Sequence, residues 1–408
     1  MKMVSPRGLL AAALMASAAP AAATNGMRMI GFGPVQDSMG GASVGAPLDS
    51  ATIVTNPAGM SDLGTRLDAS VTYFNPTVKF SATDYMAGPT NPNSVSGTSD
   101  RAASWIPTLG FIYSLNDKLA VGLGVVGVSG MGVDYGVGAY GAKTLTSYMN
   151  LRVAPAVSYK ISDQVSLGVA ANLMYATMEY EAGGMPLHDS KGSMGYGATI
   201  GLTYKPTKEL TAGLAYETKS FFGDFEWDVA AHDTMMGPVP GGTDQLSFDQ
   251  PQVLTLGASY RVIEPLLVAA DVEWINWSDT NGEGMPEFQN DPNLTGSQRW
   301  NMNWSDQVVV KVGAQFDVTK ELKVRAGYNY GKMPLDEDRA FENVAFPAVA
   351  EHHVTLGAGY DIGKLTVNVA GVWSPEAKIS GANMSQGLGA YETKMSQVAV
   401  DLGVGYKF

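Results

Sequence analysis

The chain has 408 residues, with 26 basic and 39 acidic side chains, a formal charge of −13 and no cysteine. The negative charge argues against nucleic acid as a partner, because the phosphates would be repelled, and the lack of cysteine excludes disulfides and thiolate chemistry. After the N-terminal segment no run approaches about 18 apolar residues, which excludes helical membrane spans. The mean hydropathy of −0.01 is compatible with membrane strands that alternate in polarity.

Residues 1–23 have the pattern of a secretory signal peptide. Lys2 and Arg7 precede an apolar run over residues 8–19, and small residues follow at 21–23. The run has about twelve apolar residues, too few to span a bilayer. We therefore expect export, cleavage near Ala23 and a mature chain that begins close to residue 24.

Residues 24–66 show little regular alternation and are rich in glycine, with apolar residues between the glycines. Such a segment can fold compactly without strand or long-helix geometry. We predict that it forms a plug, or hatch, inside a barrel that is too wide for its own side chains to fill. A disordered periplasmic tail is the alternative, against which the content of Met, Ile, Val and Leu argues.

Residues 67–408 alternate in polarity along many short segments, and the last segment is the clearest. Val398, Val400, Leu402 and Val404 interleave with polar or small residues, which is the period of a strand with one face toward lipid. The same pattern places Arg325 in the lumen. We predict an all-β fold, a fourteen-stranded antiparallel transmembrane β-barrel with an N-terminal plug, with strands at 67–82, 103–114, 119–131, 147–160, 165–181, 191–206, 209–221, 244–260, 266–277, 307–318, 322–332, 351–361, 365–375 and 393–408.

The predicted connections largely alternate between short and long, as in outer-membrane barrels, where short turns face the periplasm and long loops face outward. An even number of strands puts both ends of the barrel in the periplasm. Aromatic residues gather at strand ends, as interfacial girdles do. The terminal Phe408 resembles the signal by which the outer-membrane assembly machinery recognises its clients. We therefore expect the chain in the outer membrane of a Gram-negative cell, in contact with lipopolysaccharide and outer-membrane lipid.

Several motifs, spread in order along the mature chain, resemble one family. The run from Gly40 through Asp49 to Asn56-Pro57-Ala58 resembles the N-terminal hatch of the FadL/TodX family of outer-membrane hydrophobe transporters, and residues 271–278, 303–306 and 324–334 resemble its later motifs. The resemblance implies a plugged fourteen-stranded barrel that takes up long-chain fatty acids or aromatic and alkyl hydrocarbons by passive, gated diffusion. Two departures are Ser305, which stands in the place of a lysine, and a short connection at 182–190.

The resemblance also implies that the mature N-terminus reaches into the binding pocket and gates the hatch. Met27, Ile30 and Phe32 are the candidate ligand contacts, and Arg28 would be the cation nearest to a ligand head group. Residues Asn56, Pro57 and Ala58 are the candidate hinge between plug and first strand, because proline fixes its own φ and restricts the residue before it. The alternative is that all of these residues only pack the plug.

A lateral exit is a further implication of the resemblance. Glycines recur among apolar residues at 119–131, and Gly122 and Gly124 are the candidates for a bend that opens the wall sideways. The alternative is that these glycines pack against the plug.

The sequence gives no reason to expect an enzyme, a cofactor or a metal site. Two of its four histidines lie in predicted loops, and His352 and His353 are neighbours in a strand and so face opposite ways. Acidic residues at 336–338 could hold divalent cations that bridge lipopolysaccharide, although a solvated charge run is the simpler interpretation. An open porin or a structural or adhesive barrel remains the alternative to a transporter of hydrophobic small molecules.

Overall fold

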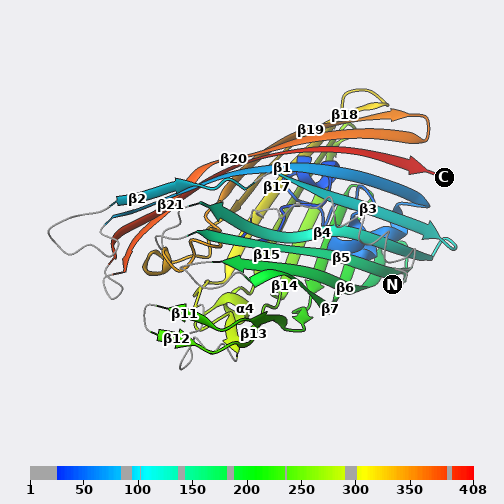
Figure 1. Ribbon diagram of the computed structural model, residues 1–408. Helices are drawn as coiled ribbons and strands as arrows, with labels where there is room; N and C mark the ends of the chain where they lie inside the picture. The colour runs from blue at the N-terminus through cyan, green and yellow to red at the C-terminus, as the bar shows by residue number, and fades with distance from the viewer. Residues whose placement is uncertain are drawn as a thin grey trace.

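The computed structural model describes residues 25–83, 94–101, 103–136, 143–181, 188–234, 237–289, 301–383 and 388–408. The expected signal peptide and most of the 182–190 connection lie outside these residues. Fourteen long strands form a closed antiparallel barrel (Figure 1), with these bounds: β1 (Arg66–Thr83), β3 (Ser104–Ser114), β4 (Leu119–Tyr135), β5 (Thr144–Lys160), β6 (Val165–Glu181), β7 (His188–Tyr204), β8 (Leu210–Glu217), β14 (Val253–Ile263), β15 (Leu266–Ile275), β17 (Gln307–Asp317), β18 (Leu322–Gly331), β19 (His352–Ile362), β20 (Leu365–Asn383) and β21 (Leu388–Lys407).

The barrel closes where its first and last strands meet. Each strand pairs with the next along the chain, and β1 pairs with β3 on one side and with β21 on the other, in a register that sets Arg66 opposite Lys407. The predicted fourteen-stranded antiparallel barrel is therefore confirmed. The strand predicted at 165–181 has those bounds in the structure, and most others differ by a few residues.

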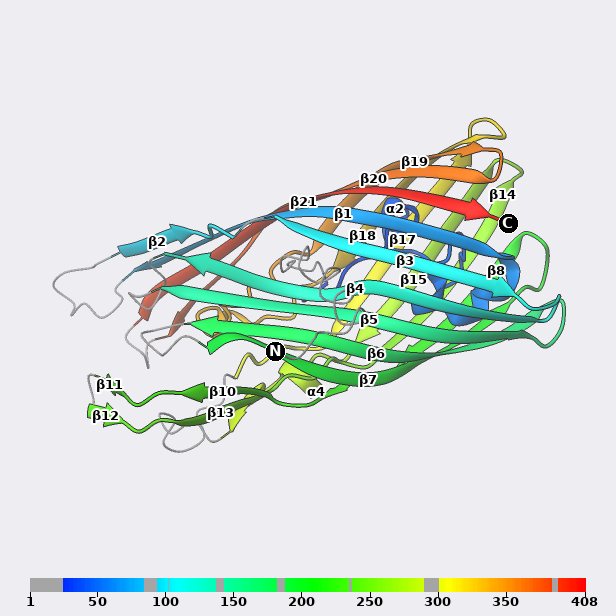
Figure 2. The same ribbon diagram turned by 45° about the vertical axis from the view of Figure 1, so that its right-hand side comes forward.

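One predicted strand, 244–260, is wrong as a single element. Pro251 has no N–H to donate and interrupts it. The barrel strand β14 starts at Val253, and β13 (Gly242–Ser247) belongs to a separate sheet with β10 (Phe225–Val229) and β16 (Glu287–Gln289). This sheet projects from one side of the barrel at the end with the long connections, together with the hairpin of β11 (His232–Thr234) and β12 (Gly237–Val239) (Figure 2). Two other short strands pair with the barrel wall, β2 (Ser94–Thr98) with β1 and β9 (Phe221–Phe222) with β7.

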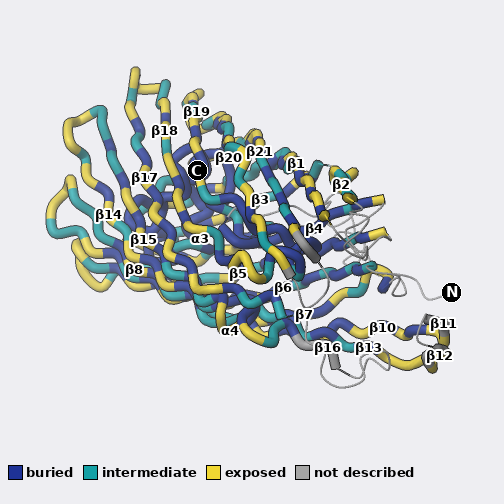
Figure 3. Tube along the Cα trace, turned by 90° about the vertical axis from the view of Figure 1, so that its left-hand side faces the viewer, coloured by how far each residue is buried: buried dark blue, intermediate teal, exposed yellow. Residues whose placement is uncertain are grey.

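Buried and exposed residues alternate along much of the barrel wall, as the colours of Figure 3 show, because successive residues of a strand point to opposite faces. In β21, Val398 is 47% exposed and Leu402 is 57% exposed, whereas Asp401 is fully buried. Arg325 is buried, as expected for a lumen residue, and donates hydrogen bonds to Gln315 and Asn368. The outer surface therefore carries the apolar residues that lipid requires.

Residues 25–65, called here the hatch segment, lie inside the barrel. They include the helices α2 (Pro34–Ser38), α3 (Thr52–Thr55) and η1 (Pro57–Asp62). Their hydrogen bonds reach strands all round the wall, since Ser50 bonds β3, Ser61 bonds β5, Asn56 bonds β7, Ser43 bonds β15 and Gly40 bonds β19. No helix of the described residues is long and apolar enough to cross a membrane.

The hatch backbone touches the wall directly where the wall has glycine. A Cβ atom added at Gly313 of β17 would lie 2.4 Å from the carbonyl oxygen of Met39, and one at Gly327 of β18 would lie 2.2 Å from the nitrogen of Gly40. Similar backbone contacts occur at Gly213 of β8 and Gly257 of β14. Any side chain at these positions would push the hatch segment away from the wall.

The loop between β18 and β19, residues 332–351, turns into the lumen at the end with the long connections. It contains η2 (Glu337–Arg339), and its residues Val344 and Phe346 are fully buried. The Thr146 hydroxyl donates to the carbonyl of Ala345 at 2.6 Å. Another connection carries the short helix α4 (Ser278–Asn281). This inward loop therefore covers the lumen from β5 to β19.

Candidate functional site

The first described residues pair with an irregular part of the wall. Arg28 forms a β-bridge with Ser129 of β4. Met29 N–H donates to the Val128 carbonyl at 3.3 Å, and Gly130 N–H donates to the Met27 carbonyl at 3.2 Å. The register of β4 against β5 shifts between Gly127 and Ser129, which is a β-bulge at Val128. The bulge thus turns backbone groups of the wall toward the start of the hatch segment.

Two of the three apolar residues predicted to contact ligand lie in one large apolar cluster. Met27 is fully buried and Ile30 is 3% exposed, and both belong to the cluster that fills the lumen above the hatch segment, together with Tyr148, Phe248, Trp277, Trp304 and Phe346. We call this cluster the apolar chamber. Phe32 belongs to a different cluster, formed by hatch residues such as Ile53 and Met60 with β3 and β4. The structure therefore places Met27 and Ile30 together in the apolar chamber, whereas Phe32 packs in the other cluster and meets Arg28 and Ile30 only in the lining of a small polar cavity.

Arg28 points sideways into a buried group of three charges. Its guanidinium donates to both carboxylate oxygens of Glu217, at 3.0 and 3.2 Å, and Arg152 donates to the same two oxygens. The exposed fractions of Arg28, Arg152 and Glu217 are 8, 1 and 6%. Bidentate pairs of this kind are strong and fix geometry. Glu217 therefore ties the start of the hatch segment to β5 and β8 together.

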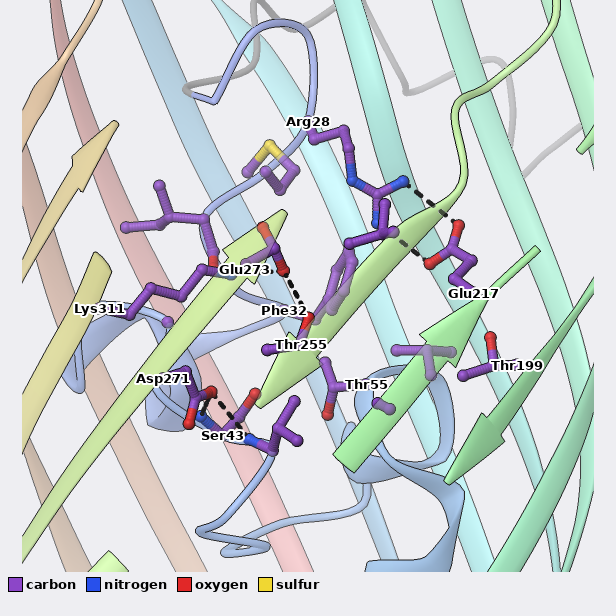
Figure 4. Close-up of a pocket in the computed structure, with 17 residues that line it drawn as sticks. Arg28, Phe32, Ser43, Thr55, Thr199, Glu217, Thr255, Asp271, Glu273 and Lys311 are labelled. Carbon is purple, nitrogen blue, oxygen red and sulfur yellow. Dashed lines mark hydrogen bonds and ion pairs between the residues drawn. The ribbon is translucent and has the colours of Figure 1, made fainter. Parts of the chain in front are cut away.

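A polar cavity of about 40 Å³ lies beside this group, and Figure 4 shows its lining. Lys311 donates to Glu273 at 3.0 Å on one side of it, and Asp271 accepts the N–H groups of Ser43 and Val44 at 2.8 and 2.9 Å. The volume suits a few water molecules. The base of the apolar chamber is therefore a polar belt in which each of the three cations, Arg28, Arg152 and Lys311, is paired with a carboxylate.

The Asn-Pro-Ala motif holds the hatch segment to the wall at β6 and β7. Asn56 Nδ2 donates to the carbonyls of Val44 and Leu202, and Asn56 Oδ1 accepts the N–H of Ala58. A Cβ atom at Gly168 of β6 would lie 2.3 Å from the backbone of Pro57 and Ala58. The motif starts η1 and clamps it between β6 and β7, and its role as a hinge stays a prediction.

Gly122 and Gly124 lie away from the irregular part of β4. Both pair with β3 and β5 without interruption. A Cβ atom at Gly122 would lie 2.6 Å from Met60 Sδ, and one at Gly124 would lie 3.1 Å from Val54. These two glycines therefore make room for the hatch segment, which is the alternative that the sequence left open, and a lateral opening at Gly122 and Gly124 stays a prediction.

The break in the wall lies farther along β4. Pairing of β3 with β4 ends at Thr108 and Val126, although β3 continues to pair with β1 as far as Ser104. Pro107 has no N–H to offer to β4, and a Cβ atom at Gly127 would lie 2.6 Å from the side chain of Ile106. The described parts of these two strands therefore separate at the bulge, where Met27 to Met29 lie against β4 from inside.

Comparison with known proteins agrees with this architecture. A family model described as "Outer membrane protein transport protein (OMPP1/FadL/TodX)" matches residues 11–408. The chain belongs to this family. It is 24% identical over 374 residues to outer membrane protein P1 of Haemophilus influenzae, covering 79% of each chain. It is 21% identical over 344 residues to the long-chain fatty acid transport protein of an Escherichia coli strain, covering 71% of this chain and 73% of that one.

Two solved structures of the family share the fold. The toluene transporter TodX of Pseudomonas putida superposes with a TM-score of 0.73 and 20% identity, over 93% of this chain and 99% of that one. A FadL homologue of Pseudomonas aeruginosa gives a TM-score of 0.74 and 17% identity, over 94% and 100% of the two chains. The chain is thus an outer-membrane β-barrel of a family that transports hydrophobic compounds, and transport rather than catalysis is the activity of that family.

Five charged residues of the polar belt were not predicted as site residues from sequence, although Asp271 and Glu273 lie in the motif at 271–278: Arg152, Glu217, Asp271, Glu273 and Lys311. A signal for them was present, because an ionisable residue inside a membrane strand must face the lumen. The polarity pattern of a single strand does not show which strands lie opposite each other across the lumen. The pairing of Glu217 with Arg28 could therefore be found only from the structure.

Asp49 of the hatch segment gives a prediction on pH. Burial, with the nearby Asp68 carboxylate, raises the pKa of Asp49 to about 7. The folded hatch then holds a proton that the unfolded chain releases, so hatch stability should fall as the pH rises from about 4 to 7. Hydrogen exchange of residues 34–63, corrected for the intrinsic pH dependence, should show this in wild type but much less in Asp49→Asn. Equal pH dependence in both proteins would contradict it.

Proposed function

We propose that this protein admits hydrophobic small molecules across the outer membrane by passive, gated diffusion, and that its mature N-terminus is the gate. The observation that carries the proposal is the position of Met27 to Ile30. They contribute side chains to the apolar chamber, pair with the bulge of β4 and, through Arg28, lie on the polar belt. A movement of these few residues would change the chamber, the wall and the belt together.

The proposed path enters the apolar chamber beneath the inward loop and leaves sideways at the bulge of β4. A hydrophobic ligand gains free energy from the apolar lining but has no partner in the polar belt below it. The separation of β3 and β4 beside Val128 offers a route from the chamber to lipid. In this proposal the hatch of residues 24–66 blocks the lumen. Residues Asn56 to Ala58 keep the hatch attached to β6 and β7 while the first residues of the hatch move.

The charges of the belt favour uncharged ligands. Arg28 and Arg152 share Glu217, and Lys311 is paired with Glu273. A ligand carboxylate would have to displace one of these buried carboxylates, which leaves a buried negative charge without its partner. The relatives include a toluene transporter and a long-chain fatty acid transport protein, and of these two ligand classes we propose the aromatic and alkyl hydrocarbons. Lipopolysaccharide and the assembly machinery remain proposed partners of the outer wall.

Uptake measured in cells tests the proposal. Initial rates of toluene and palmitate entry should be compared in a strain that lacks the gene and in the same strain with the gene restored, at concentrations low enough for the membrane to limit entry. We expect toluene entry to depend on the protein. If only small hydrophilic sugars depended on it, an open porin would be the correct function, and if no solute did, a structural or adhesive barrel would be.

Replacing Met27, Ile30 and Phe32 together by serine tests the gate. Burial of each side chain contributes roughly 1.5 to 3 kcal/mol, so the triple variant should hold its N-terminus weakly and leak ions in planar bilayers. The single variants Met27→Ser and Ile30→Ser should each leak more than Phe32→Ser, because Phe32 packs in the other cluster. Wild-type conductance and ligand binding in the triple variant would remove the N-terminus from gating.

A further inference from the structure

A row of four buried polar side chains crosses four neighbouring strands of the lumen wall. Asn329 of β18 stands opposite His353 of β19, and Ser374 of β20 stands opposite Gln397 of β21. The pair of Val354 and Trp373 sets His353 beside Ser374 in the same register. Side chains directly opposite in a sheet have Cβ atoms about 4.5–5.5 Å apart. The four side chains therefore form one continuous line, called here the polar row.

All four members face inward and have hydrogen-bonding capacity that the described protein does not use. Asn329, His353 and Ser374 are fully buried, and Gln397 is 2% exposed. Asn329 Oδ1, both ring nitrogens of His353, Ser374 Oγ and Gln397 Oε1 have no hydrogen-bond partner among the described residues outside the row, and within the row the His353 ring interacts with the Gln397 side chain. Buried polar groups are nearly always paired in proteins. A row of such atoms on one face points to a partner from outside the chain.

The surroundings of the row are mainly apolar, with Asp37 and Thr72 as polar neighbours. Val372, Met395 and Ala399 occupy inward positions on the same strands and belong to the apolar chamber. A cavity of about 10 Å³ touches Gln397 and is lined on its other side by Met29, Ile30 and Asp37 of the hatch segment and by Thr72 of β1. A ligand body at this place would take the space of Met29 and Ile30, so the row becomes accessible when the proposed gate moves.

No side chain of the polar row carries a charge. An imidazolium without a carboxylate beside it would be costly to bury, so His353 is neutral and has one donor and one acceptor. Ser374 can donate and accept, and Gln397 Oε1 accepts. Lys311 is the next inward residue in register beyond Asn329, and Glu273 neutralises it. The row therefore suits a group that both donates and accepts a hydrogen bond and has no charge.

We propose that the polar row is a recognition site for the hydroxyl group of an uncharged hydrophobic ligand such as a phenol or a long-chain alcohol. This inference rests on the proposed transport function and names a substrate class within it. The hydroxyl bonds His353 and its neighbours, and the hydrocarbon body lies against Val372, Met395 and Ala399. A plain hydrocarbon would leave the row unpaired and would bind less well.

The test compares p-cresol with toluene, which differ by one hydroxyl. Binding to purified protein in lipid nanodiscs and initial uptake by cells should be measured for wild type, His353→Leu and Gln397→Met. The matched control is His352→Leu, because His352 is the adjacent residue on the exposed outer face. Wild type should prefer p-cresol by about three- to tenfold, the gain expected from a hydrogen bond. The two row variants should lose the preference and keep toluene uptake.

Misfolding is separable from this result, because replacing an unpaired buried polar group by an apolar one of similar size should leave stability equal or higher. Heat-modifiable migration in gels checks it. If both row variants keep the preference for p-cresol, or lose binding and uptake of both probes equally, the polar row is not a recognition site. The proposed transport function would still hold. Stronger binding of the anionic p-toluate than of p-cresol would overturn the uncharged class. If uptake of none of the probes depends on the protein, the proposed function fails and this inference fails with it.

Discussion

The Glu217→Gln protein should unfold its hatch segment at lower denaturant concentration than wild type and should conduct ions in planar bilayers. Glutamine keeps the shape of glutamate but removes the charge that Arg28 and Arg152 share. Removing one partner of a buried ion pair costs roughly 3–5 kcal/mol, because the other charges stay buried without compensation. Here two arginines lose the same partner, so the effect should be at the upper end of that range.

The matched control is Glu392→Gln. Glu392 pairs with Lys378 of β20 at 3.0 Å, but this lysine is 62% exposed, and exposed pairs contribute only about 0–1 kcal/mol. A second variant, Arg28→Met, leaves Arg152 paired with Glu217 and should release the N-terminus with a smaller loss of stability. Urea unfolding in lipid vesicles, followed by tryptophan fluorescence, and single-channel recording measure the two effects. If Glu217→Gln behaved like Glu392→Gln in both assays, the three-charge group would not anchor the hatch.

Deleting Val128 should lower uptake of toluene at least tenfold while the barrel still folds. Val128 is the extra residue at the bulge, because Gly127 stands opposite Leu151 and Ser129 stands opposite Asn150. Its removal lets the side chains of β4 alternate regularly from Val126 to Met131 and lets β4 pair with β5 without a register shift. It also takes away the carbonyl that Met29 bonds. The proposed sideways route would then be closed by an ordinary strand.

Val128→Ala is the control for the deletion, since it shortens the side chain and keeps the bulge. Radiolabelled toluene uptake should stay near wild type in this variant and fall in the deletion. Heat-modifiable migration in gels should be unchanged in both. Normal uptake by the deletion variant would mean that ligand leaves the lumen by another route, for example past the hatch segment.

The wall could be predicted from sequence because its rules are local. All fourteen barrel strands were predicted from the alternation of polarity with a period of two residues and from the alternation of short and long connections. The one failure was at 244–260, where an alternating stretch runs on to a proline and the two halves belong to different sheets. The position of Arg325 in the lumen followed from the same local rule.

The site could be predicted only in part, because its contacts join residues far apart in the chain. The sequence indicated that Met27 to Phe32 matter, but not that Arg28 meets Glu217 across the lumen. A glycine in a strand can either make room for a neighbouring segment or mark a bend, and the sequence does not distinguish these two roles. Gly122 and Gly124 accommodate the hatch, whereas Gly127, a member of the same series of glycines, directly precedes the bulge at Val128.

The glycine contacts between hatch and wall bear on how this molecule is assembled. The hatch backbone lies against β8, β14, β17 and β18 with no side chain between them. A finished cylinder would leave little clearance for threading a folded segment into such a fit. We therefore expect the N-terminal residues to be enclosed while the strands gather round them, before β21 meets β1. A chain that lacks residues 25–65 should then insert more slowly, since its wall would close over an empty space.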